Sequence, residues 1–169
     1  LPGSGKSYGV VENVIIPALK DGKEVWTNIP LNSDELIKDG LPVPSQFNYD
    51  DVESSENWFF DVLPKGVLLV LDEVQLLWPA GIKQNQADKK HLEFLTKHRH
   101  LVGDNGKSTE IVLLTQRLSL IANFARSLIE KTLITNNLGV MGQPKKYRID
   151  IYAGAITSDK PNVSNRVRE

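Results

Sequence analysis

Two short stretches of the chain carry residue types that handle phosphate chemistry. A Gly-Ser-Gly-Lys-Ser string stands near the start, and a later apolar run ends in Asp72-Glu73. Glycines let backbone N–H groups turn inward around phosphate oxygens, and a lysine ammonium adds a point charge. A serine hydroxyl and a carboxylate are oxygen ligands of the kind that Mg²⁺ takes. We therefore predict phosphate binding by Gly3, Ser4, Gly5, Lys6 and Ser7, and Mg²⁺ binding by Ser7 and Asp72.

The first string is the second half of a P-loop, whose full pattern is Gly, four residues, then Gly-Lys-Ser/Thr. Because the chain opens at Leu1 inside this motif, we expect a longer protein, with the first Gly and the strand before it upstream. Taken alone, the half motif is equally compatible with a flexible turn. A helix is predicted next, kinked or ended near Ile16 by Pro17. Its apolar face comprises Val10, Val11, Val14, Ile15, Ala18 and Leu19.

The acidic pair follows a run, Val67 to Leu71, that is apolar without alternation. Such a run is typical of a strand covered on both faces in a parallel sheet, whose carboxyl end delivers residues to the ligand crevice. In this Walker B arrangement Asp72 serves the metal, and Glu73 orients and deprotonates the water that attacks the γ-phosphate. The competing interpretation is a buried strand that ends in a solvated acidic turn. The upstream Lys6-Ser7 favours the nucleotide site, and the absence of an Asn-Lys-x-Asp string favours ATP.

A third apolar run, Ile111 to Thr115, ends in Gln116. In P-loop ATPases with an extra strand between the two Walker strands, the next strand commonly ends in a polar residue near the γ-phosphate. We therefore predict that Gln116 senses that phosphate, the alternative being a side chain that only caps the strand end.

The pattern as a whole predicts an α/β domain over residues 1–157 and a polar tail or linker over 158–169. Helices are expected at Ala87 to Leu101 and at Leu118 to Glu130, the second burying Leu118, Ile121, Ala125 and Leu128. Further strands are expected at 132–135 and 147–152, with Trp58-Phe59-Phe60 packed on the core.

Composition excludes several classes of protein. With 169 residues, one domain has room for a buried core and a second has little. The absence of cysteine excludes disulfides and thiolate chemistry. A formal net charge of -1 argues against a surface devoted to nucleic acid, although a local basic patch remains compatible with it. No apolar run reaches the roughly 18 residues of a membrane-spanning helix.

Five segments together resemble the zonular occludens toxin (Zot) family of filamentous-phage assembly ATPases, which is related to the FtsK–HerA motors. These segments are Gly-Ser-Gly-Lys-Ser, Val25-Trp26-Thr27-Asn28-Ile29-Pro30, Leu71-Asp72-Glu73-Val74-Gln75, His98-Arg99-His100 and Leu114-Thr115-Gln116. The resemblance implies a three-layer P-loop sandwich with a mainly parallel sheet, lacking its first strand in this chain. It also implies a domain on the cytoplasmic face of the bacterial inner membrane, anchored by a segment outside this chain.

The same resemblance implies the activity and the partners. ATP hydrolysis with Mg²⁺ would drive filamentous virion extrusion, in a homo-oligomer working with other phage assembly proteins and with single-stranded phage DNA. Arg99 or Arg126 would act as an arginine finger across a subunit interface, the alternative being an ordinary surface salt bridge. Two other functions stay open: an FtsK–HerA-type DNA-translocating ATPase, and a nucleotide-binding assembly scaffold without turnover.

Overall fold

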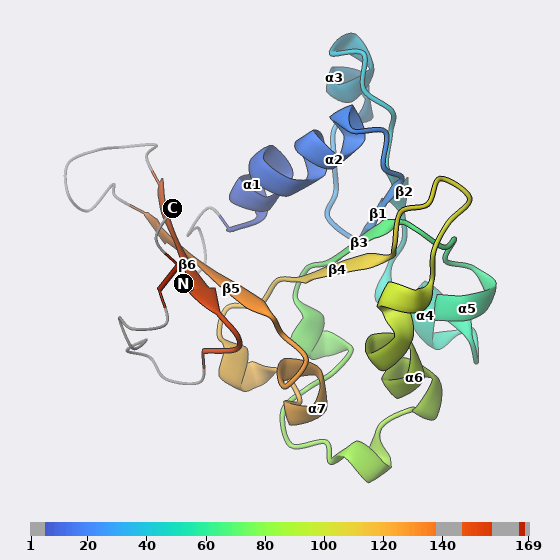
Figure 1. Ribbon diagram of the computed structural model, residues 1–169, viewed down its shortest axis with the longest axis vertical. Helices are drawn as coiled ribbons and strands as arrows, with labels where there is room; N and C mark the ends of the chain where they lie inside the picture. The colour runs from blue at the N-terminus through green and yellow to red at the C-terminus, as the bar shows by residue number, and fades with distance from the viewer. Residues whose placement is uncertain (1–5, 138–146, 157–165, 168–169) are drawn as a thin grey trace.

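The computed structural model describes residues 6–137, 147–156 and 166–167 (Figure 1). The helices are α1 (Lys6–Val10), a π-helical turn (Val11–Ile15), α2 (Ile16–Lys20), α3 (Ser33–Lys38), α4 (Tyr49–Glu53), α5 (Trp58–Asp61), α6 (Lys89–Lys97) and α7 (Asn123–Arg126). Short 3₁₀ turns occupy Val74–Leu76, Gln84–Gln86, His98–His100 and Leu118–Leu120. The strands are β1 (Val25–Thr27), β2 (Ser45–Gln46), β3 (Leu68–Leu71), β4 (Glu110–Leu113), β5 (Lys131–Asn137) and β6 (Tyr147–Ala153).

Four strands form one sheet in the order β2-β1-β3-β4, and all neighbours are parallel. Every residue of β3 is buried, because helices cover both faces of the sheet (Figure 1). Leu69 and Leu71 pack into a cluster with α4 to α7, while Leu68 and Val70 pack into a second cluster with the first helix and α3. The predicted α/β fold with a parallel central sheet is therefore confirmed, with the expected three layers.

Aromatic residues fill the larger of the two clusters. Phe59 of α5 stacks on Phe94 of α6, with ring centroids 4.3 Å apart and planes 12° apart. Trp58 is buried beside them and meets Phe59 edge to face. The predicted packing of the Trp58-Phe59-Phe60 segment on the core is thus confirmed, and it anchors the long connection between β1 and β3.

The first helix continues past Pro17, which was expected to kink or end it near Ile16. The chain passes through the π-helical turn and then enters α2, where Pro17 occupies one of the first two positions. Proline is tolerated there because the first N–H groups of a helix need no partner within it. The helix therefore reaches Lys20, and its buried Ile15 and Leu19 pack on the sheet.

The predicted helix from Leu118 to Glu130 is wrong over most of its length. Ile121 instead pairs with Pro79, the N–H of Ala80 donates to the carbonyl of Leu120, and the N–H of Ala122 donates to that of Trp78. These strand-like bonds take backbone groups that a helix would use, so only α7 is α-helical. Leu128, expected in the buried stripe, is exposed.

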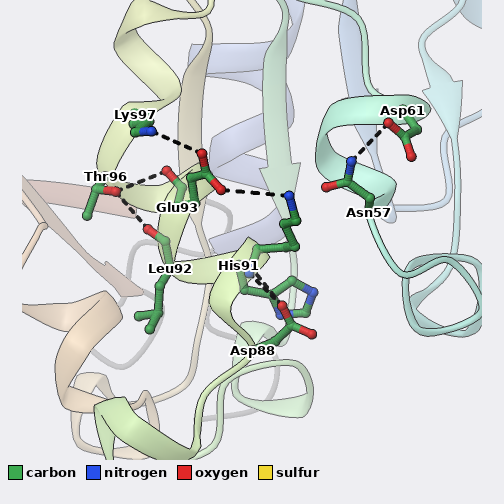
Figure 2. Close-up of polar contacts among 9 residues, drawn as sticks. Asn57, Asp61, Asp88, His91, Leu92, Glu93, Thr96 and Lys97 are labelled. Carbon is green, nitrogen blue, oxygen red and sulfur yellow. Dashed lines mark hydrogen bonds and ion pairs between the residues drawn. The ribbon is translucent and has the colours of Figure 1, made fainter.

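The other predicted helix, Ala87 to Leu101, is shorter at both ends than expected. Asp88 caps α6 by accepting from the N–H groups of Lys90 and His91, and the 3₁₀ turn His98–His100 follows α6 (Figure 2). Glu93 pairs with Lys97 along the exposed face of the helix. These local contacts stabilise α6 itself and connect it to no other element.

The strands β5 and β6 form a separate antiparallel pair, which confirms the strands expected at 132–135 and 147–152 (Figure 1). Part of the expected tail returns to this pair, since the N–H of Val167 donates to the carbonyl of Ile151 and Arg166 forms an ion pair with Asp150. Residues 158–165 and 168–169 of the expected tail lie outside the described residues. Within the described ranges, no helix is both long and apolar enough to cross a bilayer.

Candidate functional site

The carboxyl ends of β1, β3 and β4 meet at one edge of the sheet. They bring together Asn28, Asp72 and the Thr115-Gln116 pair, and α1 adds Ser7 from the same side. In a parallel α/β sheet this edge is the usual place for a ligand. Gly3, Ser4 and Gly5 lie outside the described residues, and Lys6 is the first residue of α1.

Ser7 and Asp72 are in direct contact although 65 positions separate them. The Ser7 Oγ donates to Asp72 Oδ2 at 2.9 Å in a partly buried setting. The pair thus presents a hydroxyl and a carboxylate oxygen side by side, a donor set that fits Mg²⁺ completed by phosphate and water oxygens. No group of three or more His, Asp or Glu side chains in the described ranges is arranged to hold a metal by itself.

Asn28 and Tyr49 fix the backbone of Asp72, and neither had a predicted role. The Asp72 N–H donates to Asn28 Oδ1 at 2.7 Å, and Asn28 Nδ2 donates to the Asp72 carbonyl at 2.9 Å. The Tyr49 hydroxyl donates to the same carbonyl at 2.6 Å. Burial raises the pKa of Tyr49 well above its usual range, so this hydroxyl stays a donor.

The Asn28 side chain replaces one backbone pairing between β1 and β3. β1 pairs with β3 up to Thr27 and Val70, and then the chain bends, because Thr27 Oγ1 accepts from the N–H of Ile29. The amide of Asn28 offers one donor and one acceptor, as a peptide unit does, and continues the pairing to Asp72. An Asn at this point of a Thr-Asn-Ile-Pro segment is the one available sequence signal, whereas Tyr49 gives none.

Glu73 has a left-handed backbone, with φ at 52°. This conformation costs a non-glycine residue roughly 1–2 kcal/mol, so its neighbours must impose it. The Glu73 N–H donates to Asp72 Oδ1 at 2.9 Å, and the next N–H, that of Val74, donates to the carbonyl of Leu114 at 3.0 Å. The turn is therefore tied to both Asp72 and the end of β4.

Amide groups surround the Glu73 carboxylate. Gln75 Nε2 donates to Glu73 Oε2, and Gln116 Nε2 reaches Glu73 Oε1 at 3.4 Å. The side-chain Oε1 of Gln75 in turn accepts from Thr115 Oγ1 at 2.8 Å. The structure thus brings Ser7, Asp72, Glu73 and Gln116 into one site, while their roles towards nucleotide stay predictions.

The two candidate arginine fingers lie elsewhere and have partners within the chain. Arg99 forms an ion pair with Glu130, and both side chains are about three-fifths exposed. Arg126 is half-buried and donates to Asn123 Oδ1 at 3.1 Å. An exposed ion pair contributes little to stability, so Arg99 exchanges partners at small cost.

A cavity of about 740 Å³ lies away from this site, between α5 and the start of α6. Its lining mixes acidic and basic side chains: Ser55, Glu56, Asn57, Asp61, Asp88, Lys89 and Lys90. Asn57 Nδ2 donates to Asp61 within the same turn (Figure 2). The strand-end site is the stronger candidate, because its groups converge from four distant segments.

Removing the Asn28 amide is expected to destabilise the Asp72 turn. We predict that Asn28→Ala lowers the free energy of unfolding by about 1–3 kcal/mol, since the partly buried Asp72 N–H loses its acceptor and the Asp72 carbonyl keeps only the Tyr49 hydroxyl. Urea denaturation measures this loss. Asn85→Ala, at an exposed position, is the matched control. Equal effects of the two changes would contradict the pairing of the Asn28 side chain with the Asp72 backbone.

Comparison with known proteins places this geometry in a family context. The family model described as Zonular occludens toxin (Zot) matches residues 1–168. The "Gene 1 protein" of Xanthomonas phage phiLf is 26% identical over 169 residues, covering 90% of this chain and 36% of that relative. The chain thus spans little more than a third of its curated relative.

Two solved structures have the same fold. The N-terminal domain of zonular occludens toxin from Neisseria meningitidis aligns with a TM-score of 0.60 at 19% identity, over 94% of this chain and 82% of that one. The genome packaging NTPase B204 from Sulfolobus turreted icosahedral virus 2, in complex with ATP-gammaS, aligns with a TM-score of 0.56 at 16% identity, over 90% and 88%.

Proposed function

The chain belongs to the zonular occludens toxin (Zot) family, and we propose that it is the ATP-binding and ATP-hydrolysing domain of a phage assembly protein. One observation carries the proposal: the 2.9 Å hydrogen bond between Ser7 and Asp72. The two residues that sequence patterns predict as Mg²⁺ ligands share a single site. The structural neighbour bound to ATP-gammaS and the phage relative support the same role.

In the proposed site, Lys6 and the residues before it bind the β- and γ-phosphates of ATP. Ser7 and Asp72 hold Mg²⁺, which neutralises charge on the phosphates when bound. Glu73 accepts a proton from the attacking water, and Gln116 donates to the γ-phosphate from the end of β4.

The partners proposed for the site rest on the resemblance to the family. We propose a homo-oligomer in which Arg99 or Arg126 of one copy reaches the γ-phosphate held by the next. In the whole protein, ATP turnover drives filamentous virion extrusion at the cytoplasmic face of the inner membrane, with other phage assembly proteins and single-stranded DNA. The membrane segment belongs to a region outside this chain.

Replacing Lys6 tests nucleotide binding directly. We expect Lys6→Ala in the intact protein to weaken binding of ATP with Mg²⁺ by about 10- to 100-fold, because a charge-assisted contact to phosphate is lost. Isothermal titration calorimetry measures the dissociation constant. Lys38→Ala, at an exposed position on α3, is the control. Unchanged ATP affinity in Lys6→Ala would refute the site.

Two alternative functions predict different results when ATP binding and hydrolysis by the intact protein are measured. A DNA-translocating ATPase would hydrolyse ATP faster when single- or double-stranded DNA is added, and the similarity to a genome packaging NTPase favours this alternative. A scaffold that uses nucleotide only as a structural ligand would bind ATP tightly and release no phosphate.

A further inference from the structure

The catalytic carboxylate proposed above is already engaged by side-chain amides. Glu73 Oε2 accepts from Gln75 Nε2, and Glu73 Oε1 faces Gln116 Nε2 at 3.4 Å. A general base must instead receive a proton from water. The contact with Gln116 is long for a hydrogen bond, so it is the weaker of the two. Gln75 is therefore the main partner of Glu73.

Thr115 fixes the direction in which Gln75 points. The Thr115 hydroxyl donates to Gln75 Oε1 at 2.8 Å, which leaves the NH₂ group of that amide directed at Glu73. The hydroxyl has one proton, and the carbonyl of Arg117 also lies within reach, at 3.1 Å. Donation to Arg117 is the alternative that lets Gln75 turn.

The backbone near Glu73 does not need to move for its carboxylate to be released. Asp72 Oδ1 holds the N–H of Glu73, Leu114 holds that of Val74, and Asn28 holds the peptide groups of Asp72. The Glu73 side chain is only half-buried, so a rotamer change has room. Release is then a side-chain event at a fixed turn.

We propose that Gln75, positioned by Thr115, restrains Glu73 and so limits ATP turnover. This inference rests on the proposed function. While restrained, the carboxylate lies against the end of β4. When Gln116 turns to the γ-phosphate and Thr115 turns to Arg117, Glu73 is freed. It then takes the water proton as the new O–P bond forms, and ADP leaves with the electrons of the broken P–O bond.

The test compares steady-state ATP hydrolysis by variants of the intact protein. Gln75→Leu keeps the size of the side chain and removes its donor, and we expect kcat to rise about three- to tenfold with KM unchanged. Thr115→Val should raise kcat about twofold, because Gln75 can still reach Glu73. Thr115→Ser should restore the wild-type rate, since it keeps the hydroxyl.

The controls separate a restraint from a structural role. Gln84→Leu, the same change on an exposed turn, should leave kcat unaltered. The double variant Gln75→Leu, Thr115→Val should match Gln75→Leu alone, since Thr115 acts through Gln75. A kcat at or below the wild-type value in Gln75→Leu, with ATP binding intact, overturns the restraint alone. Failure of the wild-type protein to bind ATP overturns the proposed function and the restraint together.

Discussion

Glu73→Gln is expected to lower the rate of ATP hydrolysis by about 10²- to 10⁴-fold while ATP binding stays near the wild-type level. The amide has the shape of the carboxylate but cannot accept a proton from water. Its neighbours remain in place, because Asp72, Asn28 and Leu114 hold the backbone of this turn. Phosphate release under single-turnover conditions measures the chemical step apart from product release.

Glu35→Gln on α3 provides the matched control for this experiment, since Glu35 is exposed and remote from the strand ends. Retained turnover in Glu73→Gln would mean that another group activates the water. Loss of ATP binding together with turnover would mean that Glu73 supports the structure of the site rather than its chemistry.

Gly66→Ala is expected to destabilise the fold by about 3–5 kcal/mol, more than Asn28→Ala. Gly66 lies in the turn before β3, with φ at 79°. A Cβ atom there would lie 2.7 Å from the carbonyl oxygen of Lys107 and 2.8 Å from the nitrogen of Gly103. Both are backbone atoms of the loop before β4, so neither moves without shifting that loop.

A second glycine separates backbone strain from the steric clash as causes of this loss of stability. Gly106 has a similar φ of 73°, but a Cβ atom on it would meet nothing within 4 Å. Gly106→Ala should therefore cost only the backbone strain, roughly 1–2 kcal/mol. Guanidinium denaturation of both variants measures the difference. Equal losses would show that close packing of the two loops contributes nothing.

The parallel sheet was predictable because its central strand β3 has the pattern of a buried strand. Val67 to Leu71 is apolar at every position, and all of β3 proves to be buried between two helical layers. β2 has no such pattern, because Ser45 and Gln46 are polar and lie at the sheet edge. The Leu118 to Glu130 helix was wrong for a related reason: the bonds that replace it come from residues 78–80, which local periodicity does not reveal.

The residues of the candidate site also divide into those that sequence patterns reveal and those that only the structure reveals. The P-loop serine and the Walker B acids are adjacent to recognisable local patterns, and the fold brings Ser7 to Asp72 as a parallel α/β arrangement requires. Asn28, Tyr49 and Gln75 matter through partners that are distant in sequence or through the orientation of their side chains. Their side chains have no distinctive spacing, so only the structure shows what they hold.

The all-parallel pairing of the sheet also has a kinetic consequence. Val25 pairs with Leu68, and Leu68 with Glu110, so each central pairing closes a loop of roughly 40 residues. Such distant contacts form slowly compared with the β5–β6 hairpin. During synthesis, β1 can pair with the two-residue β2 before β3 emerges, and Gln116 reaches Glu73 later still. The proposed ATP site is therefore incomplete while the first half of the chain folds, and that half must reach its structure without help from the nucleotide.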